Sequence, residues 1–189
     1  FSRSRGLGDV YKRQILITAA FYLFFITLRD FFHRKYRNLS QITAHFSFSI
    51  LILSILFNNI FSSEVITNLK INETYQAQNL KINFESIEQE NKQNFKAIRG
   101  KFIVEDQSGL IEVMQPELRI YNQPNIVTSE ADIKTNIFTD KFMTMNYVQN
   151  QDYFNIRYQV KPFMIWIWIS TILLCFSGCL SLIRRKYEN

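Results

Sequence analysis

A run of 22 residues without a charged side chain, residues 162–183, lies near the end of the sequence. A helix needs about 20 apolar residues to cross the hydrocarbon core of a bilayer, so this run is long enough to span it. Trp166 and Trp168 lie near its start, where indole side chains prefer the headgroup level, and a basic cluster follows its end, as at a cytoplasmic membrane face. We predict a transmembrane helix over residues 161–183 and a cytoplasmic tail over residues 184–189.

Two further apolar segments precede a long polar region. Residues 39–61 carry no formal charge over 23 residues and can span, whereas residues 15–28 form an uncharged stretch of only 14 residues, which is short for a span. The basic residues at 29–38 between them predict a cytoplasmic loop. We therefore expect a second transmembrane helix at 39–61 and a truncated one at 15–28.

Residues 1–14 are basic, contain glycine and differ in composition from the rest of the chain. If the loop and the tail are cytoplasmic, three crossings place residues 1–14 outside, where their positive charge contradicts the positive-inside bias. We expect them to be a foreign junction sequence joined inside a helix. The alternative is a native basic region on a signal-anchor helix, which would place the middle of the chain in the cytoplasm.

The distribution of charge argues against a nucleic-acid binder. The net charge is +6, but residues 62–160 hold ten Lys and Arg against thirteen Asp and Glu, a net charge of −3. The positive charge therefore lies beside the apolar segments, where it would contact anionic lipid headgroups. A nucleic-acid-binding protein would concentrate it on the folded region instead.

Residues 62–160 alternate between apolar and polar side chains, which predicts strands. The alternating stretches are 80–84, 102–104, 111–113, 118–120 and 154–158. Turn-forming residues at 106–109 and 149–152 predict hairpins, and residues 129–135 predict a short helix. We expect a small β-barrel or β-sandwich of six or seven short strands, inserted between the second and third transmembrane helices.

His45 is the residue most suited to carry chemistry, because it lies within the apolar segment 39–61. An ionisable side chain at membrane depth suggests a functional role, and a neutral imidazole nitrogen is a good axial ligand for haem iron. The alternative is a histidine that is hydrogen-bonded to a neighbouring helix or reaches toward headgroups. His33, which lies among basic residues, is expected to be a solvated interfacial side chain.

Thr171, Cys175 and Cys179 recur at helical spacing in the last apolar segment, next to Gly178. This spacing fits either a thiol pair for a soft metal or a stripe of small residues that lets helices approach closely. We favour close helix packing, since nothing else in the sequence completes a metal site.

The region 62–160 contains neither histidine nor cysteine, and its only glycines are Gly100 and Gly109. This composition argues against imidazole-based catalysis, a cysteine nucleophile, a zinc site and a glycine-rich phosphate loop within that region. We interpret it as a binding or positioning module.

Several separated stretches resemble one family. They are Ala44-His45, Ser63-Glu64, PELRIY at 116–121, TSEADI at 128–133, and Lys161-Pro162-Phe163 with the tryptophans and Ser177-Gly178 that follow. Their order and spacing are similar to the C-terminal part of CcmF, the cytochrome c-type biogenesis family, over about residues 15–189.

The resemblance implies a membrane haem lyase that receives haem from a haem chaperone and supports its attachment to the CxxCH motif of apocytochrome c. It implies that His45 is an axial ligand to a haem b, and that residues 62–160 lie in the periplasm of a bacterial inner-membrane protein. The implied partners are the chaperone, apocytochrome c, other maturation subunits and membrane lipid.

The chain departs from the family at three positions usually held by glycine, which are Ser47, Ser54 and Ser177 here. The second haem ligand and the tryptophan-rich haem-handling segment of the family are absent from this sequence, so the fragment lacks the rest of the active site. The alternative function is a non-catalytic, membrane-anchored module with a periplasmic β-domain, in which His45 is merely packed.

Overall fold

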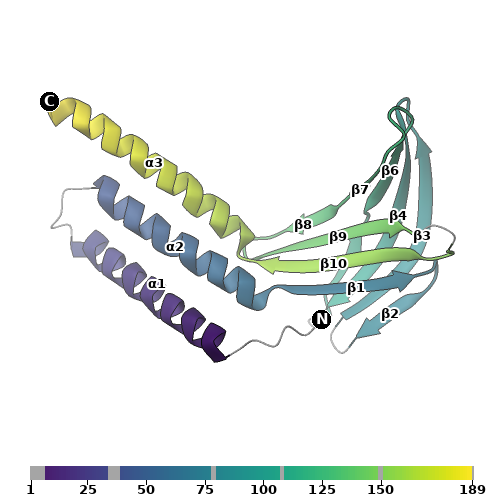
Figure 1. Cartoon of the computed structure of the whole chain (residues 1–189), viewed down its shortest axis with the longest axis horizontal. Helices are drawn as coiled ribbons and strands as arrows, with labels where there is room; N and C mark the ends of the chain where they lie inside the picture. The colour runs from purple at the N-terminus through teal and green to yellow at the C-terminus, as the bar shows by residue number, and fades with distance from the viewer. Residues whose placement is uncertain (1–6, 34–38, 78–79, 107–108, 149–150, 189) are drawn as a thin grey trace. The chain divides into compact units, whose positions relative to one another are not determined.

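A computed structural model describes residues 7–33, 39–77, 80–106, 109–148 and 151–188 (Figure 1). The chain divides into two compact units. The helical unit comprises the described residues up to Ser62, residues 137–139 and the residues from Pro162 onward; the β unit comprises residues 63–136 and 140–161. Each unit is described separately below.

Three helices form the helical unit: α1 (Leu7–His33), α2 (Leu39–Phe61) and α3 (Met164–Glu188). Two of them, α2 and the Met164–Ile183 part of α3, are long and apolar enough to cross a membrane. The bounds of α2 agree with the predicted segment 39–61. By contrast, α1 extends well beyond the predicted stretch 15–28 at both ends, because its flanking polar residues are compatible with a helix although they are not apolar.

The contact between α2 and α3 is lined by serines. Ser47 and Ser54 of α2 and Ser170 and Ser177 of α3 are all buried. Ser40 Oγ, on α2, donates a hydrogen bond to the Ser177 carbonyl oxygen at 2.9 Å. Small side chains let helix backbones approach closely, so serine here performs the packing role that glycine commonly has in membrane helices.

The predicted packing stripe on α3 does not lie at the contact with α2. Thr171, Cys175, Gly178 and Cys179 are all exposed among the described residues. The reason is geometric: successive residues of a helix are about 100° apart, so the face that carries Ser170 and Ser177 turns the neighbouring positions outward.

The β unit is an antiparallel sandwich of two sheets. The described strands are β1 (Ser63–Leu69), β2 (Thr74–Ala77), β3 (Leu80–Asn91), β4 (Phe95–Asp106), β5 (Ile111–Met114), β6 (Glu117–Tyr121), β7 (Val127–Glu130), β8 (Asp132–Thr135), β9 (Thr139–Tyr147) and β10 (Phe154–Pro162). One sheet has the order β1-β10-β9-β8. The other has the order β2-β3-β4-β6-β7, with β5 paired to β4 beside β6. Of the two predicted architectures, the sandwich is therefore the correct one, and its described residues form ten strands rather than six or seven.

The short helix predicted at 129–135 is wrong. Two strands occupy this segment, separated by Ala131: β7 pairs with β6 of one sheet and β8 pairs with β9 of the other. The polar residues Thr128, Ser129 and Asp132 suggested a capped helix from local preference alone. Pairing with the flanking strands β6 and β9 overrides that weak local preference. By contrast, the five predicted alternating stretches all lie in strands.

The core of the sandwich is aliphatic and aromatic. Phe84 and Phe102 stack with ring centroids 4.3 Å apart, and both are fully buried. Gly100 lies beside this pair: a Cβ atom there would approach a Phe102 ring carbon to 2.6 Å. The remaining buried core residues are Leu69, Ile82, Val104, Met114, Leu118, Met143, Met145, Ile156 and Tyr158.

The first and last strands of the β unit are neighbours. Ser63 at the start of β1 is the cross-strand partner of Val160 near the end of β10, and their pairing continues to Leu69 and Phe154. Arg157 of β10 donates a hydrogen bond to the Glu64 carboxylate of β1 across this ladder. The guanidinium holds the pKa of Glu64 below its usual range.

Candidate functional site

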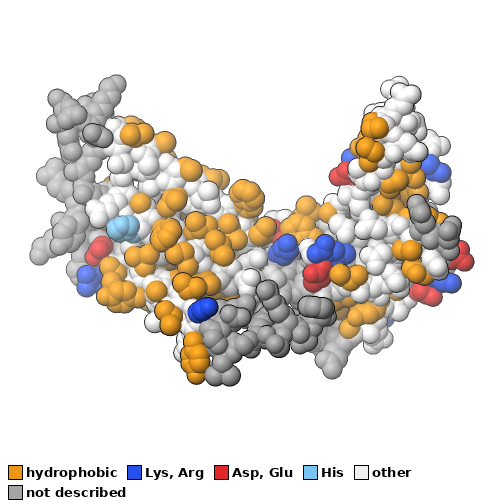
Figure 2. All heavy atoms as spheres, viewed as in Figure 1, with side chains coloured by type: hydrophobic (Ala, Val, Ile, Leu, Met, Phe, Trp, Pro, Cys, Tyr) orange, Lys and Arg blue, Asp and Glu red, His pale blue; other side chains and the backbone are white. Residues whose placement is uncertain are grey.

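His45 lies on an open face of α2. Its side chain is exposed among the described residues, as are those of Gln41, Phe48 and Ile55, which follow the same side of the helix. In Figure 2 a histidine (pale blue) is visible on the surface, with hydrophobic side chains nearby. The opposite side of α2 carries the buried Ser47 and Ser54, so packing within the helical unit turns His45 outward.

The imidazole of His45 forms no hydrogen bond or ion pair with any described residue. A ring nitrogen can therefore act as a ligand without first breaking a contact within the described chain. No group of three or more His, Cys, Asp or Glu that could hold a metal ion occurs among the described residues. His45 can thus supply one ligand to a metal centre, and further ligands would have to come from elsewhere. His33 lies at the end of α1, where its side chain falls outside the described residues.

A second candidate site is a charge network on the six-stranded sheet. Glu117 of β6 accepts hydrogen bonds from Arg99 of β4, with Nε at 2.9 Å, and from Arg119 of its own strand, with Nε at 3.3 Å and Nη2 at 3.2 Å. The register explains the cluster, because Arg99, Glu117 and Glu130 lie opposite one another on three adjacent strands. Arg119 also approaches Glu130 to 3.7 Å, and its guanidinium lies 5.2 Å from the centroid of the Phe95 ring.

The network shifts the ionisation of its members. Hydrogen bonds from Arg99, followed by those from Arg119, hold the pKa of Glu117 below its usual range although burial opposes this. The same contact with Glu117 raises the pKa of Arg99. All three groups are therefore charged across the physiological pH range, and the cluster presents a fixed pattern of charge.

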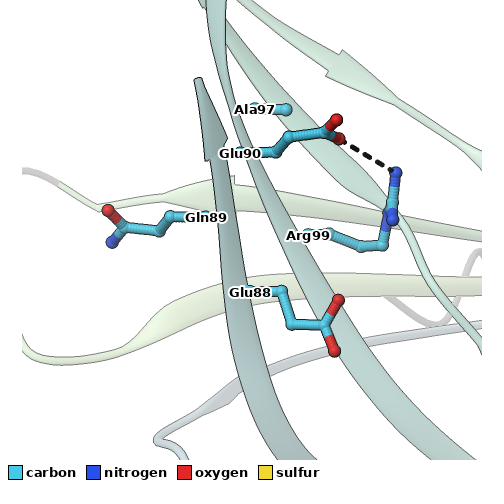
Figure 3. Close-up of a pocket in the computed structure, with 5 residues that line it drawn as sticks. All are labelled: Glu88, Gln89, Glu90, Ala97 and Arg99. Atoms are coloured by element: carbon cyan, nitrogen blue, oxygen red, sulfur yellow. Dashed lines mark ion pairs between the residues drawn. The ribbon is translucent and has the colours of Figure 1, made fainter. Parts of the chain in front are cut away.

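A pocket adjoins this network (Figure 3). It has a volume of about 380 Å³ and is lined by Glu88, Gln89, Glu90, Ala97 and Arg99. Glu90 and Arg99 come within 4.0 Å of each other across it. Glu88 forms no ion pair within 4.0 Å with any described residue, although its charge contributes to the raised pKa of Arg99. The pocket thus presents a carboxylate without a direct partner beside a small apolar floor at Ala97. Such a pocket can accept a polar or cationic side chain, but it lacks the imidazole and thiol groups that acid–base or nucleophilic catalysis commonly uses.

A third cluster joins the two sheets. Lys141 of β9 contacts Glu112 of β5 at 2.9 Å and Asp106 of β4 at 3.3 Å. Burial alone would lower the pKa of Lys141, but its hydrogen bonds to the two carboxylates outweigh burial and raise it. Burial also raises the pKa of nearby Tyr158. Since the partners lie on opposite sheets, this cluster is an ionic link within the sandwich rather than an open site.

Sequence reasoning did not identify either charge cluster. Arg99, Glu117 and Lys141 are charged residues, which in a sequence ordinarily indicate solvent-facing surface. The register between strands brings them together, and no spacing within one segment signals that register. The stretch PELRIY at 116–121 contains two members of the network, but it was informative only as part of a family resemblance.

The fold defines an antiparallel β-sandwich inserted between two helices long enough to span a membrane. Residues 60–162 match the model of the CcmF C-terminal beta-sandwich. The chain therefore belongs to the CcmF family of cytochrome c biogenesis proteins, as its sequence resemblance predicted.

Relatives extend this match. The chain is 31% identical to the cytochrome c-type biogenesis protein ccl1 of Rhodobacter capsulatus over 120 residues, which are 64% of this chain and 18% of that protein. It is 26% identical to CcmF of Pseudomonas fluorescens over 145 residues, which are 77% of this chain and 22% of that protein. The chain thus spans about a fifth of the length of these curated relatives. A solved structure, cytochrome c heme lyase CcmF, matches this chain with a TM-score of 0.62 and 12% sequence identity. The match covers 94% of this chain and 35% of the solved chain, and it shows that the two share a fold.

Proposed function

We propose that this chain forms part of a membrane haem lyase for cytochrome c maturation, and that His45 is an axial ligand to a haem b. The observation that carries the proposal is the outward-facing imidazole of His45 on an apolar helix, without a hydrogen bond to the described residues. The exposed Phe48, one turn from His45 on the same helix face, suits the edge of a porphyrin, which is largely apolar. Membership in a family of cytochrome c biogenesis proteins supports the same reading.

The residues around His45 fit one side of a haem site. The imidazole would hold the iron from one face, and exposed apolar side chains of α2 would cover part of the macrocycle and exclude water. When bound, haem supplies a redox-active iron whose potential depends on its axial ligands and on their hydrogen bonds. The second axial ligand would come from outside this chain.

We propose three membrane crossings, with the basic segments 29–38 and 184–189 in the cytoplasm and residues 62–160 in the periplasm of a bacterial inner-membrane protein. The first segment begins within the end of α1, and the second includes the end of α3. The distribution of basic residues supports this orientation. Under this topology residues 1–14 precede the first crossing, for which we retain the interpretation of a foreign junction. Protection of the β unit from added protease in spheroplasts would contradict the periplasmic placement.

The β unit would bind and position a partner of the reaction, either the haem chaperone or apocytochrome c. The charged pocket beside Arg99 supports this role, since it offers fixed charges and an unpaired Glu88 on the surface of a sheet. The absence of histidine and cysteine from residues 62–160 supports a positioning role over a catalytic one.

The ligand assignment can be tested in a full-length family member that carries this segment. We expect His45→Ala to remove or shift the Soret and α bands of the purified protein, and added imidazole to restore them in part. Gln41→Ala, one turn away on the same exposed face, should leave both bands unchanged and serves as the matched control. Equal elution in size-exclusion chromatography would establish that the variants are folded. Unaltered bands in His45→Ala would refute the assignment.

The charged pocket favours a second candidate function, a membrane-anchored assembly module that binds a partner without contributing to haem chemistry. In that case Glu88→Lys would weaken cytochrome c maturation, whereas His45→Ala would not. The proposed lyase role predicts that His45→Ala also impairs maturation, so the two variants distinguish the candidates.

A further inference from the structure

A short segment between two strands of the sandwich belongs to the helical unit. Residues 137–139, which connect β8 to β9, cluster with the helices rather than with the sheets. Two hydrogen bonds fix them there: Trp166 Nε1 donates to the Ile137 carbonyl oxygen at 2.9 Å, and the Phe163 amide donates to the Phe138 carbonyl oxygen at 2.7 Å. The connection is therefore held at the level of the first turn of α3.

The same level also contains the end of α2. Asn58 Nδ2 donates to the Pro162 carbonyl oxygen at 2.7 Å, and the rings of Phe57 and Phe163 lie 5.4 Å apart. Phe163 has a φ of 61°, a left-handed conformation that is uncommon for a large side chain and lets the chain turn into α3. Its ring in turn lies 6.4 Å from that of Phe138. The connection 137–139 and two helix ends thus form one aromatic layer.

Large apolar side chains of this layer remain exposed. The exposed fractions are 62% for Ile137, 61% for Phe138 and 61% for Phe61. No charged residue occurs between Lys134 and Asp140, so the tip of the connection carries only uncharged side chains. A loop that ended in bulk water would expose these apolar side chains at a cost in free energy.

We propose that Ile137 and Phe138 insert into the headgroup–acyl boundary of the bilayer on the side where α3 begins. The proposal rests on the proposed membrane crossing of α3. If α3 spans, its first turn lies at that boundary, where tryptophan and other aromatic side chains are preferred. The hydrogen bonds from Trp166 and Phe163 place the connection at the same level. If α3 spans, lipid surrounds its exposed face at this depth, and the headgroup–acyl boundary matches an uncharged apolar tip.

Fluorescence quenching in proteoliposomes tests the depth of this tip. Cys175 and Cys179 are the only cysteines of the sequence, and both are exposed, so Cys175→Ser with Cys179→Ser gives a background for single labels. Phe138→Cys and, separately, Ile137→Cys would carry the environment-sensitive dye NBD. The host lipid is phosphatidylcholine with a nitroxide placed either near the headgroup or near the end of the acyl chain.

Two control positions calibrate the depth. Ile172→Cys, exposed on α3, reports the span itself, and Ile111→Cys, exposed on β5, reports a position in the β unit. We expect blue-shifted emission at Ile137→Cys and Phe138→Cys with stronger quenching by the shallow nitroxide, the opposite order at Ile172→Cys, and no quenching at Ile111→Cys.

The possible results distinguish failure of the proposed lipid contact from failure of the proposed membrane crossing of α3. Quenching at Ile172→Cys without quenching at residues 137 and 138 would overturn the lipid contact and leave the crossing of α3 intact. Blue-shifted but unquenched emission at the tip would show a protein partner there and would also overturn the inference. Absence of quenching at all positions would overturn the membrane crossing together with the inference.

Discussion

Replacing Glu117 by glutamine should destabilise the β unit in a pH-dependent way. The Glu117 side chain is only 15% exposed and accepts hydrogen bonds from two arginines, whose side chains are 34% and 33% exposed. Removing one partner of a buried ion pair costs about 3–5 kcal/mol, whereas a fully exposed pair contributes about 0–1 kcal/mol. Because both arginines remain partly solvated, we expect a loss of about 1–2 kcal/mol in the free energy of unfolding at neutral pH.

The sign of the pH dependence follows from the lowered pKa of Glu117. A carboxylate with a pKa lower in the folded than in the unfolded state stabilises the fold above the unfolded pKa, and this contribution disappears as the pH falls through the folded pKa. The difference in the free energy of unfolding between the native chain and Glu117→Gln should therefore be largest at neutral pH and should decrease in acid, at about pH 3.

Urea titration of the detergent-solubilised chain, followed by circular dichroism, measures this difference. With a slope of about 1–3 kcal/mol per molar urea, a loss of about 1–2 kcal/mol lowers the midpoint by about 0.3–2 M. Glu130→Gln is the matched control, since its carboxylate is 44% exposed and meets Arg119 only at 3.7 Å; we expect a change below about 0.5 kcal/mol. An equal loss at pH 7 and pH 3 would refute the electrostatic reasoning and assign the cost to packing.

Three further changes test other parts of the fold. Gly100→Ala should cost about 1–3 kcal/mol in urea titration, since the new Cβ would overlap the Phe102 ring, and an unchanged midpoint would contradict this packing. Lys141→Met removes the cation that links the sheets and should lower the free energy of unfolding by about 1–3 kcal/mol, after allowance for its partly exposed partners. A higher unfolding midpoint than that of the native chain would mean that the cost of burying the ions outweighs their attraction. Ser177→Leu should separate α2 from α3, because this position is buried at their contact; reduced cross-linking between cysteines introduced on the two helices would report it, and native-level cross-linking would exclude the serine-lined contact.

The parts of the fold that a local pattern encodes could be predicted from the sequence. The helix at 39–61 follows from length and apolarity, and the strands around Phe84, Phe102 and Ile156 follow from alternation over several residues. Strand β9 was missed although it is nine residues long, because its sequence TDKFMTMNY mixes polar and apolar side chains without a strict period. Strands β7 and β8 were mistaken for a helix because cross-strand pairing with β6 and β9, and not local sequence preference, determines their conformation.

The candidate sites also differ in whether the sequence alone reveals them. His45 stands out in the sequence because a titratable side chain in an apolar segment is unusual, and its outward orientation on α2 agrees with the ligand role that remains a prediction. The α3 stripe does not face α2, because spacing identifies residues that share a helix face but does not show which face meets a given neighbour. The Arg99–Glu117 network depends on register between strands, which the sequence of either strand alone does not contain.

The pairing of β1 with β10 has a consequence for how such a protein can be assembled. Ser63 and Val160 are direct partners on neighbouring strands, so the sandwich begins and ends at almost the same point in space. A module whose two ends coincide can be added to, or removed from, a connection between two helices without pulling them apart. A short Gly/Ser bridge joining residues 62 and 161 would remove the sandwich together with residues 137–139, and it should leave α2 and α3 able to pair.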